Sequence, residues 1–262
     1  MSMIRLGGLV LAAWGMVAAA ASEGRCQDIP TYALSDWAYY NNWTWIRIER
    51  GELERAEESV RLAIKAIEPF QATHCRLLAR SYRDLSWVLY LEKRPAQAEP
   101  LGKWALTVYE QDTRVSPDSL FQSLFTLALI ERDLHKSKDA IPLLTRALKL
   151  QESTVGPADP GIADTLEVIA ALHESEGQYS LAEPLFRRLI AIREKDRPEL
   201  NLDLASAAEH YASVLTKLDR GAEAKTFLAR AAAIRQAAAD GGLLQKPKRT
   251  PPKLVATASR GR

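Results

Sequence analysis

Residues 155–194 read VGPADPGIADTLEVIAALHESEGQYSLAEPLFRRLIAIRE, and this stretch decides the fold. On either side of Gly177 its apolar side chains recur at intervals of three and four residues, which is the spacing of one face of an α-helix and not of a strand. Pro157 and Pro160 precede the first apolar series, and Gly177 separates it from the second. The stretch therefore predicts two amphipathic helices joined by a short turn.

The same arrangement returns with a period of 42 residues. One position of the period holds alanine every time, at Ala56, Ala98, Ala140, Ala182 and Ala224. The position seven residues further on holds Ala63, Ala105, Ala147, Leu189 and Ala231. Twelve residues before the alanine the sequence has Thr44, Ser86, Ala128, Ala170 and Ala212, each directly after a larger residue. Small residues beside large ones at fixed positions are what two closely packed helices require.

Repeats of this kind predict the architecture. A single helical hairpin cannot cover its own apolar face, so successive hairpins stack and bury it against their neighbours. We therefore expect an all-α fold, a right-handed α-solenoid of about five helix-turn-helix repeats over residues 31–240, with a concave groove along one side.

Glycines and prolines mark the expected turns. Glycines are expected near the turn inside a repeat, at Gly51, Gly177 and Gly221. Prolines are expected in the connections between repeats, at Pro117, Pro157, Pro160 and Pro198. Three further prolines share the period and are expected in the first turn of a helix, where a missing N–H costs little: Pro100, Pro142 and Pro184.

Two motifs in the deciding stretch connect the chain to a known family. Gly156-Pro157 with Pro160 resembles the G-P-x-x-P turn of the kinesin-light-chain type of tetratricopeptide repeat. Gly177-Gln178-Tyr179, followed by Ala182-Glu183-Pro184-Leu185, resembles the G-x-Y…A-E-P-L helix opening of the same repeat. The small and large columns resemble such repeats over about four fifths of the chain. The resemblance implies a solenoid that binds proteins or peptides, but it names no partner, because one fold hosts many functions.

The chain departs from that subtype in its asparagines. Kinesin-light-chain repeats commonly carry paired asparagines in the first helix, where they face the groove. Here only Asn41-Asn42 fits the pattern, and the equivalent pair in the next repeat is Arg83-Asp84. The resemblance therefore implies a scaffold and not the cargo-binding role of kinesin light chains.

The repeat frame also predicts which side chains of the first helices line the groove. The predicted partner-binding residues are Asn41, Trp45, Arg83, Trp87 and Phe125. Exposed aromatic side chains beside an arginine are typical of interaction sites, so we expect an apolar group of a peptide on the tryptophans and an acidic group toward Arg83. The alternative is that both tryptophans belong to the core, because the first repeat is rich in aromatic residues throughout.

Charge is unevenly distributed along the chain. The formal net charge is +2, but all 33 acidic residues lie between residues 22 and 240, together with 28 of the 35 basic ones. Residues 241–262 carry six basic residues, three prolines and no acid. This composition predicts a disordered basic tail that either contacts an anionic surface or has no specific partner. The pI near 8.5 is thus a property of the chain ends, and a nucleic-acid-binding surface is not indicated.

The first 21 residues have the plan of a secretory signal peptide. Arg5 precedes an uncharged run over residues 6–21 that ends in three alanines and is too short to span a bilayer comfortably. We expect cleavage near Ala21, an N-terminal extension over residues 22–30 and an exported chain, periplasmic or secreted, without a membrane span. The alternative is an uncleaved segment that anchors the chain in a membrane. In an oxidising compartment Cys26 and Cys75 are expected to form a disulfide, the alternative being two unpaired thiols.

No motif indicates catalysis. The four histidines lie outside HExxH and nucleophile motifs, and the chain has no phosphate-binding glycine loop. We therefore expect no enzyme activity, no cofactor and no metal. The predicted function is an exported, non-catalytic scaffold that binds a protein or peptide partner in the concave groove. The alternative is a permanent structural subunit of an envelope-associated assembly, docking by its convex face or its basic tail, and an accessory enzyme role is a more distant one.

Overall fold

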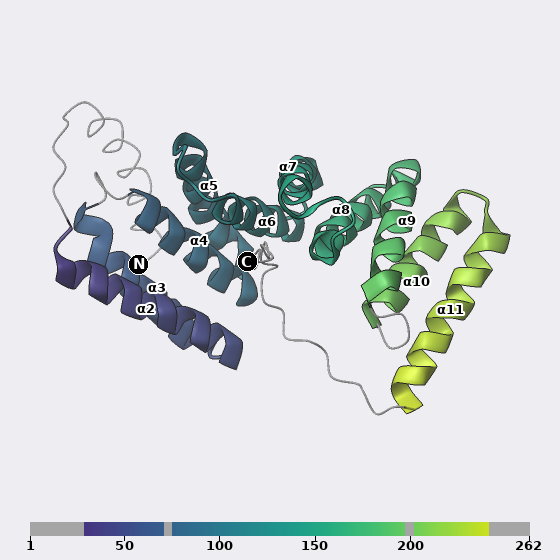
Figure 1. Cartoon of the computed structure of the whole chain (residues 1–262), viewed down its shortest axis with the longest axis horizontal. Coiled ribbons are helices and arrows are strands. Elements are labelled where there is room, and N and C mark those ends of the chain that lie inside the picture. Colours follow the sequence, from purple (N-terminus) through teal and green to yellow (C-terminus); the bar gives the residue numbers. More distant parts are fainter. Residues whose placement is uncertain (1–28, 71–74, 197–201, 241–262) are drawn as a thin grey trace, which may run out of the picture. The chain divides into compact units, whose positions relative to one another are not determined.

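The computed structural model describes residues 29–70, 75–196 and 202–240, and over these ranges the fold is all-α. Helices make up 88% of the described residues, which contain no strand. In chain order the α-helices are α2 (Thr31–Arg50), α3 (Leu53–Ile67), α4 (Cys75–Leu91), α5 (Pro95–Gln111), α6 (Pro117–Asp133), α7 (Ser137–Val155), α8 (Ala163–Ser175), α9 (Tyr179–Asp196), α10 (Leu202–Lys217) and α11 (Gly221–Asp240) (Figure 1). The expected solenoid of helix-turn-helix repeats is confirmed.

Several predicted features lie outside the described residues. They are the signal peptide over residues 1–21, Cys26, Pro198 and the basic tail over residues 241–262. The disulfide therefore stays a prediction. None of the described helices is both long enough and apolar enough to cross a membrane.

The chain divides into two compact units, Met1–His135 and Lys136–Arg262. In the first unit α2 packs on α3 and α4 on α5, while α3 contacts α4 and α5 contacts α6. In the second unit α8 packs on α9 and α10 on α11, while α7 contacts α8 and α9 contacts α10. We call α2, α4, α6, α8 and α10 the first helices and the others the second helices of their repeats.

The periodic small residues form the core of both units. Every alanine of the main column is at most 2% exposed, and the column seven residues further on is at most 1% exposed. The column of Thr44, Ser86, Ala128, Ala170 and Ala212 is equally buried, at 2% or less. Larger side chains fill the space between these close contacts, among them Phe121 in the first unit and Phe186 in the second, both 0% exposed. Burial of this apolar surface is what holds neighbouring hairpins together.

The turn inside each repeat uses a left-handed residue at one fixed position. Five residues spaced by 42 have positive φ: Gly51 (76°), Lys93 (62°), His135 (59°), Gly177 (71°) and Asp219 (60°). At four of them the next residue donates its N–H to the carbonyl five residues before it, as in Glu52 to Arg47 (2.9 Å) and Gln178 to His173 (2.8 Å). This closure satisfies carbonyls at the end of the first helix and reverses the chain. Gly51 and Gly177 thus lie at the predicted turns, and Gly221 begins α11.

The periodic prolines lie deeper in their helices than predicted. Because α5, α7 and α9 begin at residues 95, 137 and 179, Pro100, Pro142 and Pro184 each occupy the sixth position, and the expected placement in the first turn is wrong. A proline there removes the hydrogen bond to the carbonyl four residues earlier. All three prolines are exposed, so water can reach the carbonyls they leave behind. The first position of a helix is instead held by Pro95 in α5 and by Pro117 in α6.

Candidate functional site

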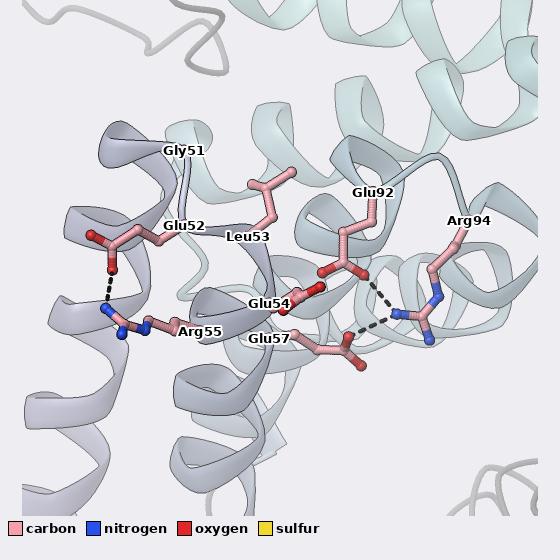
Figure 2. Close-up of a pocket in the computed structure, with 8 residues that line it drawn as sticks. All are labelled: Gly51, Glu52, Leu53, Glu54, Arg55, Glu57, Glu92 and Arg94. Atoms are coloured by element: carbon pink, nitrogen blue, oxygen red, sulfur yellow. Dashed lines mark hydrogen bonds and ion pairs between the residues drawn. The ribbon is translucent and has the colours of Figure 1, made fainter.

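A hollow of about 710 Å³ lies beside the turns of the first two hairpins (Figure 2). Its lining comes from the α2–α3 turn, the start of α3 and the α4–α5 turn, and consists of Gly51, Glu52, Leu53, Glu54, Arg55, Glu57, Glu92 and Arg94. Four glutamates stand against two arginines, so the lining carries two negative charges in excess. We call this feature the acidic hollow.

Arg94 connects two sides of the acidic hollow. Its Nη1 donates to Glu57 Oε2 at 2.7 Å and to Glu92 Oε2 at 2.6 Å. Burial by itself would raise the pKa of the Glu57 carboxyl, but hydrogen bonds from Arg61 and Arg94 outweigh burial and hold the pKa below its usual range. Arg94 therefore fastens the turn of the second hairpin to α3 of the first.

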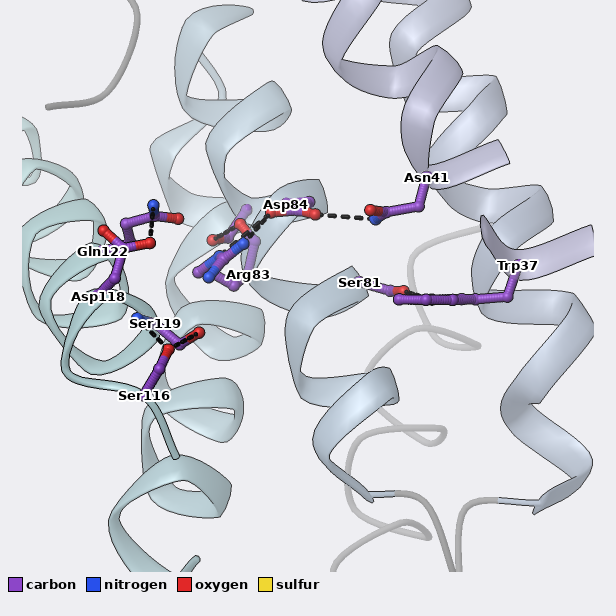
Figure 3. Close-up of polar contacts among 10 residues, drawn as sticks. Trp37, Asn41, Ser81, Arg83, Asp84, Ser116, Asp118, Ser119 and Gln122 are labelled. Atoms are coloured by element: carbon purple, nitrogen blue, oxygen red, sulfur yellow. Dashed lines mark hydrogen bonds and ion pairs between the residues drawn. The ribbon is translucent and has the colours of Figure 1, made fainter. Parts of the chain in front are cut away.

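A buried polar cluster joins the first helices α2 and α4 (Figure 3). Asp84 accepts at Oδ1 from Arg83 Nε (3.1 Å) and Nη2 (2.8 Å), and at Oδ2 from Asn41 Nδ2 (3.0 Å). Asp84 is 0% exposed, Asn41 3% and Arg83 6%. Burial by itself would lower the pKa of Arg83, but the charge of Asp84 and its hydrogen bond outweigh burial and raise it, so the guanidinium stays charged. A buried ion pair persists only with this degree of hydrogen bonding, because desolvating each charge costs several kcal/mol.

Beside this cluster, an arginine of α4 is held in place by an aromatic ring. The Arg80 guanidinium lies 5.4 Å from the ring centroid of Trp37, and Trp37 Nε1 donates to Ser81 Oγ at 2.9 Å. Stacking on a ring leaves the N–H groups at the edge of a guanidinium open for other acceptors. Arg80 is exposed, and it has no carboxylate partner in the described part of the chain.

Arg76 extends this basic strip by one helical turn. It is 49% exposed along its side chain and stands 3.8 Å from Asp112, too far for a hydrogen bond. Asp112 is engaged by Arg114 instead, whose backbone N–H and guanidinium donate to it and hold its pKa below the usual range. Arg76 and Arg80 are the exposed positions of α4, whose remaining described side chains are buried or half-buried.

Tyr109 of α5 lies close to the same arginines. Burial raises the pKa of its hydroxyl to about 12, even though the positive charges of Arg83, Arg80 and Arg76 each act to lower it. The phenol is thus neutral over the physiological range and 2% exposed. Four arginines (76, 80, 83 and 114) stand against two carboxylates (Asp84 and Asp112) here, which leaves two positive charges in excess.

The start of α6 supplies uncharged and acidic groups near this strip (Figure 3). Ser116 caps the helix by accepting the backbone N–H of Ser119 at 3.2 Å, and Gln122 donates to Asp118 at 2.8 Å. The negative charge of Asp118 is one of the causes that raise the pKa of Arg83. We call the exposed and half-buried side chains Trp37, Trp45, Arg76 and Arg80 the first-helix surface.

The predicted partner-binding residues are more deeply placed than expected. Trp87 and Phe125 are both 4% exposed, Trp87 against Tyr90 with ring centroids 5.2 Å apart and Phe125 against Phe121 at 5.6 Å. The expectation of a joint exposed patch with Trp45 is therefore wrong for these two, and the alternative placement of Trp87 in the core holds. Asn41 and Arg83 spend their polar groups on Asp84 as described above. Trp45 alone of the five is half-buried.

In the second unit, the acidic residues of the first helices are paired inside their own hairpins. Arg193 Nη2 donates to Glu167 Oε2 at 2.8 Å, and Arg235 Nη2 donates to Glu209 Oε2 at 2.7 Å, one repeat later at the same offset of 26 residues. The Arg235 hydrogen bond holds the pKa of Glu209 below its usual range. The acidity expected on these helices is thus largely neutralised.

The offset between contacting first helices explains which residues the sequence reading missed. Asn41 contacts Asp84, 43 residues on, and Trp37 contacts Ser81, 44 residues on. Neighbouring first helices therefore meet one or two residues beyond the period of 42. Comparing positions at 43, the sequence would have paired Trp37 with Arg80.

The described residues contain no group of three His, Cys, Asp or Glu side chains that could hold a metal ion. The structure thus supplies the first-helix surface and the acidic hollow as the candidate sites of the first unit.

The sequence and the fold were compared with known proteins. A tetratricopeptide repeat family model matches residues 119–195, and no curated protein matches the sequence. Among solved structures, BtubC (BKLC) from P. vanneervenii is 20% identical with a TM-score of 0.68, over 94% of this chain and 96% of its own. A kinesin light chain from P. anserina with nearly identical tetratricopeptide-like repeats is 16% identical with a TM-score of 0.64, over 76% of this chain and 94% of its own.

YrrB, a tetratricopeptide protein with an unusual peptide-binding site, is 18% identical with a TM-score of 0.54, over 78% of this chain and 91% of its own. At these identities the likeness concerns the fold. It agrees with the resemblance that the repeat motifs carry.

Proposed function

Since the chain carries tetratricopeptide repeats, we propose that it is a non-catalytic protein-interaction scaffold whose first-helix surface binds a partner segment with a carboxylate beside an apolar side chain. The observation that carries the proposal is Arg80, which is exposed, oriented by Trp37 and without a carboxylate partner among the described residues. A stacked arginine loses little side-chain entropy when it binds a carboxylate in two-point fashion.

The remaining residues of the surface support an acidic ligand. Arg76 is only loosely engaged by Asp112, and the excess of two positive charges around Tyr109 attracts an anion. Arg83, which the sequence placed opposite the acidic group, is already compensated by Asp84, so Arg80 takes that role in the proposal. Trp45 and Trp37 offer half-buried ring faces for the apolar side chain. YrrB, which shares the fold, has a peptide-binding site.

The experiment that tests this function needs no prior partner. Random peptides are selected on the wild-type protein, and the Kd of each enriched peptide is measured by fluorescence anisotropy. We expect Asp or Glu next to an aromatic or aliphatic residue in the enriched sequences. Arg80→Ala should then weaken binding by about 10-fold to 100-fold, since a charge-assisted hydrogen bond contributes about 1.5–3 kcal/mol.

Lys65→Ala is the matched control, because it removes one exposed positive charge from the second helix α3. It should change the Kd by less than about twofold. Enriched peptides without acidic residues, or equal losses in the Arg80 and Lys65 variants, would refute the assignment.

We further propose that the scaffold acts outside the cytoplasm, periplasmic or secreted, with residues 1–21 as a cleaved signal peptide. The charge and hydropathy plan of residues 1–21 supports this. Cell fractionation with N-terminal sequencing tests it: a mature chain that starts near Ser22 is expected. A full-length chain in the membrane fraction would instead favour the anchored alternative.

A permanent structural subunit remains the second candidate function. It is favoured by exposed tyrosines on α2, where Tyr32 is 68% exposed and Tyr39 59%. Light scattering separates the two, because a transient adaptor is monomeric when purified alone and a permanent subunit is oligomeric or poorly soluble.

A further inference from the structure

We propose that the acidic hollow is a second binding site, for ammonium and guanidinium groups, and that its occupant is the basic segment of this chain over residues 241–262. The hollow is separate from the first-helix surface: it is lined by the turns within the hairpins and the start of α3. Its volume of about 710 Å³ falls within the range of about 300–1,000 Å³ that ligand sites occupy.

The charges of the lining leave acceptors for an incoming cation. Arg55 binds Glu52 at 3.2 Å, and Arg94 bridges Glu57 and Glu92. Glu54, at the start of α3, is exposed and has no ion-pair partner within the described ranges. The lining therefore keeps negative charge that its own arginines do not compensate.

Glu92 supplies the independent indication of a missing donor. Its Oε2 accepts from Arg94, but its Oε1 is buried and has no hydrogen-bond partner, while the whole side chain is only 11% exposed. A buried carboxylate oxygen without a donor is unfavourable, because it has lost its hydration without replacement. Glu54 and Glu92 line the hollow from α3 and from the α4–α5 turn (Figure 2), so one ammonium group with its three N–H donors can serve both.

The segment over residues 241–262 has the complementary chemistry. It contains Lys246, Lys248, Arg249, Lys253, Arg260 and Arg262 and no acidic residue. A run of bases without internal acids has no carboxylate of its own to pair with, so it seeks acceptors elsewhere. Charge complementarity between a site with two negative charges in excess and this segment is the reason for choosing it as the occupant.

The receptor for the test is the full chain with Lys246, Lys248, Arg249 and Lys253 replaced by Gln, which removes competition from its own segment. A fluorescein-labelled peptide of residues 241–262 is titrated against it, with anisotropy as the readout. Saturable binding is expected, weakening several-fold when the salt concentration rises from about 0.05 M to about 0.3 M. Absence of saturable binding would overturn the proposal.

Variants then locate the site. Glu54→Gln and Glu92→Gln should each weaken the peptide at least about fivefold, and Glu58→Gln, an exposed neighbour that does not line the hollow, should leave the Kd unchanged. Circular dichroism melting curves establish that each variant is folded, and Glu54→Gln is exposed enough to fold in any case. Equal effects of all three variants would mean diffuse attraction to α3 and would overturn the site.

Spermidine tests the source of the cation. At equal concentration of positive charge it should compete at least about tenfold less well than the unlabelled peptide. Equal competition would mean that the hollow accepts any organic cation, and the assignment to residues 241–262 would fall.

Discussion

Gly177→Ala and Gly221→Ala should change stability in opposite directions, although neither added methyl group meets an obstacle. Nothing lies within 4 Å of a Cβ built at either residue, so packing contributes no difference. Gly177 has φ of +71°, whereas Gly221, at the start of α11, lies outside the left-handed region. Any difference between the two substitutions therefore reports the backbone conformation alone.

The magnitude follows from two general contributions. Alanine in the left-handed region costs about 1–2 kcal/mol. At both positions alanine also restricts the unfolded chain and returns about 0.4–1 kcal/mol. Gly177→Ala should therefore lower the free energy of unfolding by about 1 kcal/mol, and Gly221→Ala should raise it by about 0.5 kcal/mol. Lys93→Gly, at the equivalent left-handed position of the second repeat, should raise it by a few tenths to about 1 kcal/mol for the mirror-image reason.

Urea unfolding followed by far-UV circular dichroism measures these changes, and thermal melting provides a second readout of about 2–4 °C for each kcal/mol. Gly221→Ala is the matched control, since it makes the same chemical change in open space. If Gly177→Ala and Gly221→Ala shift the midpoint in the same direction by the same amount, the left-handed position is not strained and the reasoning fails.

Two further predictions concern buried charge. Asp84→Ala leaves the Arg83 guanidinium, 7% exposed, without a counter-charge and should cost about 3–5 kcal/mol in urea unfolding, whereas Arg83→Met combined with Asp84→Leu should recover most of that loss; a single-site cost below about 1 kcal/mol would contradict the account. Burial by itself would raise the pKa of Glu183, but hydrogen bonds from Arg187, Tyr211 and Arg220 outweigh burial and lower it, so its stabilisation is present above its ordinary pKa of 4.5 and is lost as pH falls below that value. Glu183→Gln should therefore lower the Tm at neutral pH and reduce the further fall in Tm below pH 4.5, and an unchanged acid profile would refute this role.

The helices and their buried columns could be predicted because packing imposes them on every repeat. Each hairpin must bury a small residue where the next one crosses it, and so alanine returns at Ala56, Ala98 and onward, all within 2% of complete burial. The turn was predictable where it holds Gly51 and Gly177. It was hidden at Lys93, His135 and Asp219, because those residue types do not announce a positive φ.

The candidate site was harder to predict, because the contacts that build it connect different helices. The column of residues at a strict spacing of 42 placed Trp87 and Phe125 on the surface, whereas the actual offset of 43 or 44 between first helices turns them into the core. Which acid satisfies which base was equally invisible, since Arg83 could have faced a ligand or Asp84. Only coordinates show that Asp84 holds it.

The ion pairs of the second unit differ in whether they stay within one repeat. Glu167 with Arg193, and Glu209 with Arg235, are each contained in a single hairpin, so a duplicated or deleted repeat carries its own neutralisation with it. The pair of Glu183 with Arg220 joins one hairpin to the next, and removing either repeat would leave its partner unmatched. A gene encoding such a chain can therefore gain or lose whole repeats without electrostatic penalty inside them, while the joints between repeats constrain which neighbours are compatible.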